Sequence, residues 1–321
     1  MQLHGLHHVT AVTGDAPGNL DFYTRVLGLR LVKKTVNQDD TSAYHLFYAD
    51  KLGSPGTDMT FFDWPQTGPN RRGTDSIVNT QFRVNGRDAL NYWSARFDEF
   101  NVTQHPIETF NGRDILRFED PEGQRLTLVD DGGFPVEGEV WDGTDVPVEY
   151  AIRGFFAVSL SVPNSAQVGL ILNQALNFEE STRLPNPDDP SQEVIIYSMD
   201  GGGPGKEVHL YIQPGTPRAW LGRGGVHHVA FRLRDSEEQR AWESHLTRIG
   251  LGTSGVVDRF YFKSLYFRIS SGILFELATD GPGFDADEPL ESLGERLALP
   301  PFLEPRRAQI ESGLRPLETV N

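Results

Sequence analysis

Two segments of this chain open an apolar strand with the same histidine doublet. The first reads Leu6-His7-His8-Val9-Thr10-Ala11-Val12, and the second reads Val226-His227-His228-Val229-Ala230-Phe231. A strand that recurs together with its two histidines indicates a repeated structural unit, so the fold must place two similar strands in similar surroundings. Histidine is also the commonest protein ligand for metal ions, and two copies on equivalent strands indicate a metal site.

A third candidate ligand lies on the apolar strand predicted at Gly272-Ile273-Leu274-Phe275-Glu276-Leu277-Ala278, where Glu276 is the one charged residue. Burying an ionised carboxylate is costly unless it is paired or coordinates a cation. Two imidazoles and a divalent ion would satisfy Glu276, which makes these three residues a candidate ligand set.

The same order of elements, a strand and a helix followed by several strands, recurs four times along the chain. The first repeat is the clearest. Its opening strand covers His8 to Val12, and its helix is capped near Asp15 and stopped by Gly28. Further strands of this repeat are predicted at Leu29–Val36, Ala43–Ala49 and Asp58–Phe62.

A segment rich in glycine, proline and acidic residues, Gly132 to Pro147, is predicted to be a linker between the second and third repeats. We therefore divide the chain near residue 150. The N-terminal half, 1–150, contains repeats at about 4–64 and 77–131. The C-terminal half, 151–321, contains repeats at about 152–214 and 225–280. The tail from Asp285 to Asn321 is expected either to wrap the repeats or to contact a second subunit, in which case the chain forms a homo-oligomer.

The composition excludes several classes of function. The chain has no cysteine, so a metal must be held by histidine, carboxylate, tyrosine or backbone oxygen. Its formal net charge is -16 without a long basic run, which argues against nucleic acid and anionic membranes as partners. No stretch is apolar enough for a membrane span and no signal peptide is recognisable, so a cytoplasmic enzyme is expected.

Several of these segments together resemble the vicinal oxygen chelate superfamily, which includes glyoxalases, bleomycin resistance proteins and extradiol dioxygenases. The resemblance covers nearly the whole chain and is strongest to the ring-cleaving dioxygenases that act on hydroquinones. It rests on both doublet strands, on Gly272-Ile273-Leu274-Phe275-Glu276, and on the segment Tyr44-His45-Leu46-Phe47-Tyr48-Ala49-Asp50-Lys51-Leu52-Gly53-Ser54-Pro55-Gly56-Thr57.

The resemblance implies an α+β fold in which four βαβββ modules pair into two half-open barrels. It also implies that the metal ligands are the second histidine of each doublet and the late glutamate, which are His8, His228 and Glu276. Alignment of the repeats supports the same choice, because the corresponding residues elsewhere offer neither imidazole nor carboxylate. These residues are, approximately, Asn79, Ala157, Thr60 and Thr127. A single metal site is expected where the first and fourth modules meet.

Two neutral imidazoles and one carboxylate suit non-haem Fe(II) and leave up to three adjacent positions open. Two of these positions can chelate a diol and one can take oxygen. The resemblance therefore implies an Fe(II)-dependent ring-cleaving dioxygenase of the extradiol type, with a hydroquinone or catechol and O2 as its substrates. Mn(II) is the alternative metal.

Three alternatives remain open, and one of them, a degenerate homologue with a purely structural role, is disfavoured by the presence of the triad. A glyoxalase-type isomerase or lyase would use Ni(II), Zn(II) or Mn(II) and would consume no oxygen. The glyoxalase I pattern holds its metal with four protein groups, whereas the aligned fourth position here is a threonine. A protein that only binds or sequesters an aromatic compound would need the barrel but not the triad, and the presence of His8, His228 and Glu276 argues against it.

The resemblance also points to two residues that would contact the substrate. Tyr266 could hydrogen-bond a substrate oxygen, and Arg259 could hold a phenolate. Each has a structural alternative, a cross-strand aromatic for Tyr266 and a surface ion pair for Arg259. Thr10 lies two residues after His8, on the same face of the strand, and either lines the pocket or fills space.

Each doublet contains one histidine more than the metal needs. Because successive side chains of a strand face opposite sides, His7 and His227 are expected to point away from the ligands. We expect His7 to pack, and His227 to approach the site through a bend in its strand.

Overall fold

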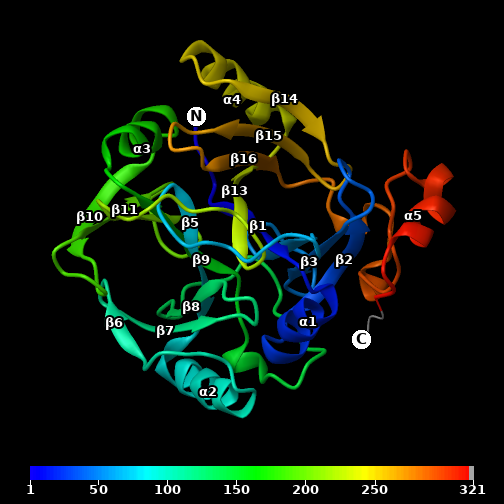
Figure 1. The fold of residues 1–321 in the computed structure, drawn as a ribbon, viewed down its shortest axis with the longest axis horizontal. Helices are drawn as coiled ribbons and strands as arrows, with labels where there is room; N and C mark the ends of the chain where they lie inside the picture. The colour runs from blue at the N-terminus through cyan, green and yellow to red at the C-terminus, as the bar shows by residue number, and fades with distance from the viewer. Residues whose placement is uncertain (318–321) are drawn as a thin grey trace.

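The computed structural model describes residues 1–317 and confirms four modules, each containing a strand, a helix and three further strands (Figure 1). The first module contains β1 (Leu6–Thr13), α1 (Ala16–Asp21), β2 (Arg30–Val36), β3 (Tyr44–Ala49) and β4 (Asp58–Asp63). The second contains β5 (Ser76–Val84), α2 (Gly86–Glu99), β6 (Glu108–Phe110), β7 (Arg113–Glu119) and β8 (Arg125–Asp130). The third contains β9 (Phe155–Val162), α3 (Ala166–Leu170), β10 (Glu179–Pro185), β11 (Glu193–Ser198) and β12 (Glu207–Ile212). The fourth contains β13 (Gly225–Leu233), α4 (Ser236–Arg248), β14 (Thr253–Asp258), β15 (Lys263–Arg268) and β16 (Leu274–Thr279).

The helices of the first and third modules are short because they change winding. After Asp21 the chain continues as one π-helical turn, Phe22–Val26, and after Leu170 it continues as another, Ile171–Ala175. The first of these ends at Leu27, and Gly28 follows with φ +66°, the left-handed geometry that glycine adopts without strain.

The modules pair into two curled eight-stranded sheets, which confirms the predicted α+β architecture (Figure 1). Sheet 1 joins the first and fourth modules in the order β14-β15-β16-β13-β1-β4-β3-β2. Sheet 2 joins the third and second modules in the order β10-β11-β12-β9-β5-β8-β7-β6. The seam of each sheet is an antiparallel pair, β1 with β13 and β5 with β9. Each sheet therefore takes one module from either side of residue 150, and the division of the chain at that residue stays a prediction.

The two halves of the chain correspond residue for residue, with an offset of 149 positions. The hydrogen bond from the Gly56 amide to the carbonyl of His7 (2.7 Å) is repeated by the bond from Gly205 to Phe156 (2.7 Å). The strand registers of sheets 1 and 2 follow the same offset. Every residue of the metal-site barrel thus has a counterpart in sheet 2, which serves as an internal comparison.

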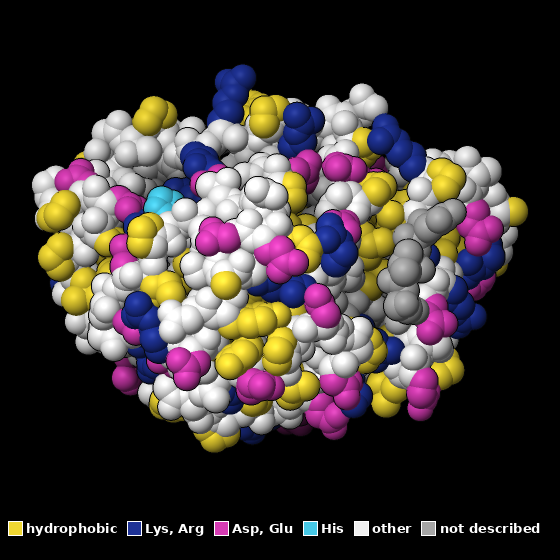
Figure 2. Space-filling view, turned by 90° about the horizontal axis from the view of Figure 1, so that it is seen from below, with side chains coloured by type: hydrophobic (Ala, Val, Ile, Leu, Met, Phe, Trp, Pro, Cys, Tyr) yellow, Lys and Arg dark blue, Asp and Glu magenta, His cyan; other side chains and the backbone are white. Residues whose placement is uncertain are grey.

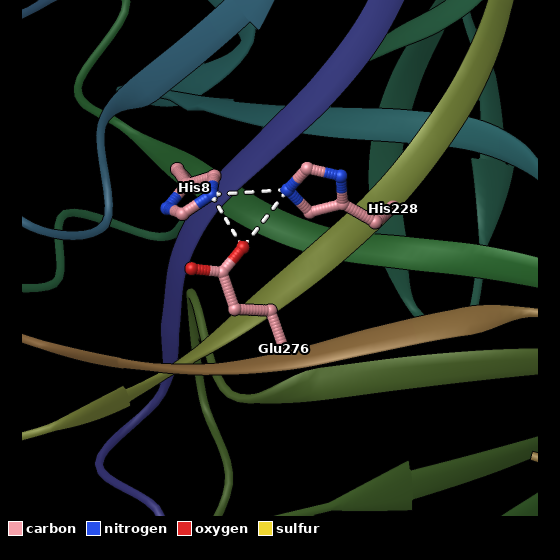
Figure 3. Close-up of side chains that lie close together, drawn as sticks. All are labelled: His8, His228 and Glu276. Carbon is pink, nitrogen blue, oxygen red and sulfur yellow. Dashed lines mark hydrogen bonds and ion pairs between the residues drawn. The ribbon is translucent and has the colours of Figure 1, made fainter. Parts of the chain in front are cut away.

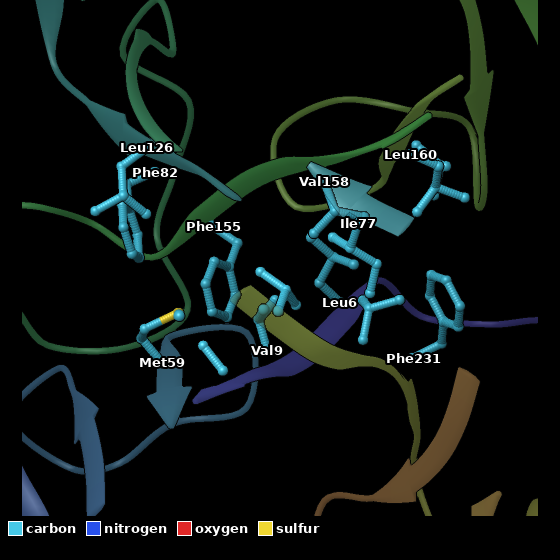
Figure 4. Close-up of a cluster of buried hydrophobic side chains, with 14 of the residues drawn as sticks. Leu6, Val9, Met59, Ile77, Phe82, Leu126, Phe155, Val158, Leu160 and Phe231 are labelled. Atoms are coloured by element: carbon cyan, nitrogen blue, oxygen red, sulfur yellow. The ribbon is translucent and has the colours of Figure 1, made fainter. Parts of the chain in front are cut away.

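The main apolar core lies between the seams of the two sheets (Figure 4). β13 packs against β5 across this core. Residues from all four modules contribute, and those labelled in Figure 4 are Leu6, Val9, Met59, Ile77, Phe82, Leu126, Phe155, Val158, Leu160 and Phe231. Because the seam strands bury apolar side chains here, their remaining side chains face the interior of each curled sheet.

The C-terminal tail wraps the first module, which is one of its two expected positions. It includes the 3-10 turns Phe284–Ala286, Leu290–Ser292 and Glu304–Arg306 and the helix α5 (Arg307–Gly313), which lies beside β2 in Figure 1. Every residue of β2 is buried, whereas its counterpart β10 is mostly exposed. The tail therefore buries a strand whose counterpart in sheet 2 stays exposed to solvent. Residues 318–321 of the tail lie outside the described part of the chain.

On the face drawn in Figure 2, acidic and basic side chains are interspersed. None of the helices within residues 1–317 has the length and apolar character needed to cross a membrane.

Candidate metal centre

His8, His228 and Glu276 converge at the seam of sheet 1 (Figure 3). They come from three neighbouring strands, β1, β13 and β16. Oε2 of Glu276 lies 3.1 Å from Nε2 of His8 and 2.9 Å from Nε2 of His228, and the two nitrogens are 3.3 Å apart. Among the described residues, this is the one group of three or more histidines and carboxylates close enough to share an ion.

The strand register explains why residues so distant in sequence meet. His8 pairs with Ala230 across the seam, and Ala230 pairs with Glu276 on the next strand. His228 pairs with Thr10, two residues along β1. The three ligand side chains therefore occupy neighbouring positions on one face of the sheet.

The three ligand atoms fit a metal ion. Ligand atoms about 2.1 Å from one ion and at right angles to each other would lie about 3.0 Å apart, close to the observed separations. Glu276 is fully buried, and its Oε1 has no hydrogen-bond partner among the described residues. Burial alone would raise the pKa of Glu276, but the adjacent His8 and His228 hold it well below its usual value. A buried carboxylate whose only partners are two imidazoles is the environment that a cation stabilises.

Both histidine doublets lie at β-bulges, so the expected alternation fails there. Between β1 and β13 the pairing skips His7 on one strand and His227 on the other. An extra bulge residue turns its side chain out of the regular alternation. Nδ1 of His7 lies 2.9 Å from Nδ1 of His8, and Nδ1 of His227 lies 2.8 Å from Nδ1 of His228. The first histidine of each doublet therefore contacts the second instead of pointing away from it.

These contacts assign the protons of the first doublet. Nε2 of His7 lies 3.1 Å from the carbonyl oxygen of Thr279, which can only accept, so His7 donates from Nε2. Burial, with a contribution from His8, lowers the pKa of His7 to about 3, which leaves its Nδ1 as an acceptor. His8 must then donate from Nδ1, and in its neutral form its Nε2 faces Glu276 without a proton. An imidazole held in this way presents a lone pair to a metal.

A small cavity of about 40 Å³ opens onto the triad between the first and fourth modules. Its apolar wall includes Phe47, Phe62 and Phe262. An apolar cavity that accommodates benzene measures about 150 Å³, so the present cavity is too small to hold one aromatic ring. Ring binding requires the cavity to widen.

Arg259 and Tyr266, the two residues to which the resemblance points, both line this cavity. Tyr266 pairs with Glu276 across β15 and β16, and its ring centroid is 5.8 Å from that of His228. Nε of Arg259 donates to the Tyr266 hydroxyl at 3.4 Å. Burial raises the pKa of Tyr266, so the phenol keeps its proton at neutral pH.

Arg259 also takes part in the ion pair that was its structural alternative. Its guanidinium donates to both carboxylate oxygens of Asp39, at 3.1 and 2.8 Å. The side chain of Gln38 donates to the Arg259 carbonyl oxygen at 2.8 Å. The loop 37–43 of the first module is thereby fastened over the cavity to the fourth module.

The other two candidate site residues, Thr10 and His227, are not among the residues that line this cavity. Thr10 is fully buried, and its hydroxyl is hydrogen-bonded to that of Thr60 at 2.8 Å. The ring of His227 packs against Phe62 and Trp64 as well as His228. A catalytic role for either residue stays a prediction.

His45 and Asp39 are among the cavity residues that sequence reasoning did not single out. His45 was noticed only as part of a matching segment, and its place on β3 opposite Phe62 depends on register. Asp39 belongs to the hydrophilic loop after β2, which carries no signal of its target. Three-dimensional pairing was needed to find both.

Sheet 2 has no equivalent of the triad. The counterparts of His8, His228 and Glu276 are Ala157, Asn79 and Thr127, and Asn79 donates to Thr127 at 2.8 Å. A direct hydrogen bond replaces the ligand set there.

Comparisons with known proteins agree with this description. Residues 5–128 match the family model described as the glyoxalase/bleomycin resistance protein/dioxygenase superfamily. A Bacillus subtilis protein named "Putative ring-cleaving dioxygenase MhqA" is 48% identical over 99% of this chain and 100% of its own length. The chlorohydroquinone/hydroquinone 1,2-dioxygenase of Sphingobium indicum is 34% identical over 94% of this chain and 93% of its own length. A crystal structure of a Bacillus subtilis "putative dioxygenase" superposes with a TM-score of 0.89 at 38% identity, covering 99% of this chain and 98% of the other.

Proposed function

The chain belongs to the glyoxalase/bleomycin resistance protein/dioxygenase superfamily, and from that premise we propose that it is an Fe(II)-dependent dioxygenase that opens a hydroquinone ring. The observation that carries this proposal is the convergence of His8, His228 and Glu276 around one point, with the Oε1 of the buried Glu276 lacking a hydrogen-bond partner among the described residues. Two histidines and one carboxylate form the ligand set of non-haem Fe(II) oxygenases, and Mn(II) is the alternative occupant.

A fourth protein ligand is lacking within the described part of the chain, which favours a dioxygenase over a glyoxalase-type isomerase. The position in the first module that corresponds to Glu276 is Thr60, whose hydroxyl is held by Thr10 and His45. Coordination positions not taken by the protein are available to the diol and oxygen.

When bound, the metal would supply adjacent positions for a deprotonated hydroxyl of the diol and for O2, and a path for electrons between them. The protein supplies the remaining groups. Arg259 carries a positive charge next to the triad and can hold the substrate as a phenolate. Tyr266 is a protonated phenol beside Glu276, so it can donate a hydrogen bond to the substrate oxygen nearest the metal ligands.

The cavity wall and the loop 37–43 keep water from the reacting ring. Phe47, Phe62 and Phe262 provide an apolar surface on which an aromatic ring can pack. The Arg259 guanidinium forms an ion pair with Asp39, so an anionic substrate would compete with Asp39 for the same group. This exchange would couple substrate binding to movement of the loop.

The test is oxygen uptake by anaerobically Fe(II)-loaded protein supplied with hydroquinone, catechol and their methyl ethers. Stoichiometric uptake with a ring-opened product is expected for hydroquinone, and the Glu276→Ala variant should show none. Tight iron binding without uptake from any diol would contradict the proposal and favour an oxygen-independent isomerase or lyase.

A further inference from the structure

His45 lines the metal-site cavity but has no role in the function proposed so far. It lies on β3, and its ring packs against Phe47 and Phe62 with centroid distances of 4.0 and 4.5 Å. Its Nε2 is 3.0 Å from the hydroxyl of Thr60, which is in turn hydrogen-bonded to Thr10. The imidazole is thus held by two aromatic contacts and by one hydrogen bond at Nε2.

The second nitrogen of this ring is available. Nδ1 of His45 has no hydrogen-bond partner among residues 1–317, and it is not one of their fully buried polar atoms that lack a partner. It is therefore at least partly exposed, and it belongs to a ring that lines the cavity. Burial lowers the pKa of His45 well below its usual value, with smaller contributions from His8 and His228, so the ring is neutral and can donate or accept one hydrogen bond.

The fold does not require a histidine at this position. The counterpart of His45 in sheet 2 is Val194, which pairs with Tyr211 as His45 pairs with Phe62. Val194 is completely buried, so an apolar side chain satisfies the same place in the same fold. The histidine at position 45 is therefore better explained by a ligand of the metal-site cavity than by the packing of the fold.

The register places His45 on the far side of that cavity from the ligands. His228, Thr10 and Thr60 are neighbours in one row across the sheet, so Thr60 lies two strand spacings, roughly 10 Å of backbone, from His228. His45 reaches Thr60 from the next strand outward. Of the polar side chains that line the cavity, Tyr266 pairs with a metal ligand on the neighbouring strand, whereas His45 lies two strands from β1 on the other side of the seam.

A para-diol matches this arrangement better than an ortho-diol. With one oxygen at the metal, a para-diol carries its second oxygen across the full width of the ring, whereas an ortho-diol carries it next to the first. Phe47 and Phe62, whose rings pack against His45, also line the cavity and offer an apolar surface to an aromatic ring. Only a para-diol would bring a hydroxyl to His45.

We infer that Nδ1 of His45 hydrogen-bonds the second hydroxyl of a para-diol, and that this contact gives the site its preference for para-diols over ortho-diols. The inference rests on the proposed function, because it assumes that the first hydroxyl lies at the metal.

The affinity of the protein for phenols, measured at equilibrium without turnover, tests the inference about His45. Hydroquinone, phenol and catechol are titrated anaerobically into the metal-loaded protein and followed by calorimetry. The wild-type protein should bind hydroquinone about tenfold more tightly than phenol, the factor expected for one hydrogen bond made in a closed cavity. His45→Phe should remove this difference and should weaken hydroquinone binding relative to catechol binding by the same factor, while leaving phenol binding unchanged.

Two polar variants separate substrate contact from structural support. Asn reproduces the position of Nδ1, and Gln reproduces that of Nε2. His45→Asn should keep the preference for hydroquinone, whereas His45→Gln should keep the bond to Thr60 and lose the preference. His209→Phe, which removes a buried histidine from the corresponding region of sheet 2, is the matched control and should bind as the wild type does.

Each outcome decides one point. A preference kept by His45→Phe, or kept by Gln and lost by Asn, would overturn the inference and leave the proposed function standing. Failure of the wild-type protein to bind any of the three phenols would contradict the proposed function and the inference together.

Discussion

The substitution Lys33→Met tests how the C-terminal tail is held to the metal-site barrel. Lys33 is fully buried, and its ammonium group donates to Asp287 at 2.7 Å, to the Phe284 carbonyl oxygen at 2.9 Å, and to Glu288. The ammonium group also lies 4.7 Å from the centroid of the Tyr261 ring. The Glu288 side chain is 1% exposed, so removing Lys33 leaves a carboxylate buried without its main partner.

Breaking a buried ion pair on one side costs about 3–5 kcal/mol. We therefore expect Lys33→Met to lower the free energy of unfolding by about 3–5 kcal/mol in urea titrations. Replacing both partners, as in Lys33→Met/Glu288→Leu, should recover much of this loss, because no charge is then left unpaired. Limited proteolysis should show earlier cleavage of the tail in the single variant than in the double variant.

The matched control is Arg183→Met, at the position of sheet 2 that corresponds to Lys34. Arg183 pairs with Glu180 on an uncovered strand, where the two side chains are 49% and 38% exposed. Solvent screens such a pair, so this variant should lose less than about 1 kcal/mol. A loss of similar size in the two single variants would refute the reasoning from burial.

Three further predictions concern the loop over the cavity, a buried acid and the metal. Asp39→Ala should lower the KM for a phenolic substrate by roughly two- to fivefold, because Arg259 is freed and an ion pair with one exposed partner is worth up to about 1 kcal/mol. Asp188→Ala, at the corresponding loop of sheet 2, should leave KM unchanged, and equal effects of the two variants would count against a loop that competes with substrate. Burial raises the pKa of Asp120 to about 7, above the unfolded value of about 3.9, so its ionisation destabilises the folded state as pH rises from about 4 to 7. The stability of the wild type relative to Asp120→Asn should fall over that range in urea titrations, and a constant difference would contradict this. Removal of bound metal by a chelator should lower the Tm of the wild type and not that of Glu276→Gln, since only the former gains stability from the ion.

The sequence was sufficient for the repeats, the α+β architecture and the residues that come together at the seam of sheet 1. The His8 and His228 strands are long, apolar and duplicated, and Glu276 is conspicuous among apolar neighbours. Such signals depend on local pattern, which sequence retains.

What sequence could not supply depends on register. Alternation along a strand would turn His7 and His227 away from the ligands, but a bulge adds one residue to each strand and brings both next to a ligand histidine. The sequence predicts a bend for His227 alone, and no local signal marks the bulge at His7. His45 and Arg259 are more than two hundred positions apart and meet only through the order of strands in sheet 1. The same holds for Lys33, a charged residue in the middle of β2, whose burial follows from a tail at the other end of the chain.

Metal content measured directly tests the central claim. Protein incubated with Fe(II) under anaerobic conditions and freed of excess metal should retain one iron per chain. His228→Ala and Glu276→Gln should retain almost none while still folded by circular dichroism. Glu207→Gln, which alters a carboxylate that contacts His209 in sheet 2, should retain one iron. Iron retained by Glu276→Gln, or lost equally by Glu207→Gln, would contradict a metal centre formed by His8, His228 and Glu276.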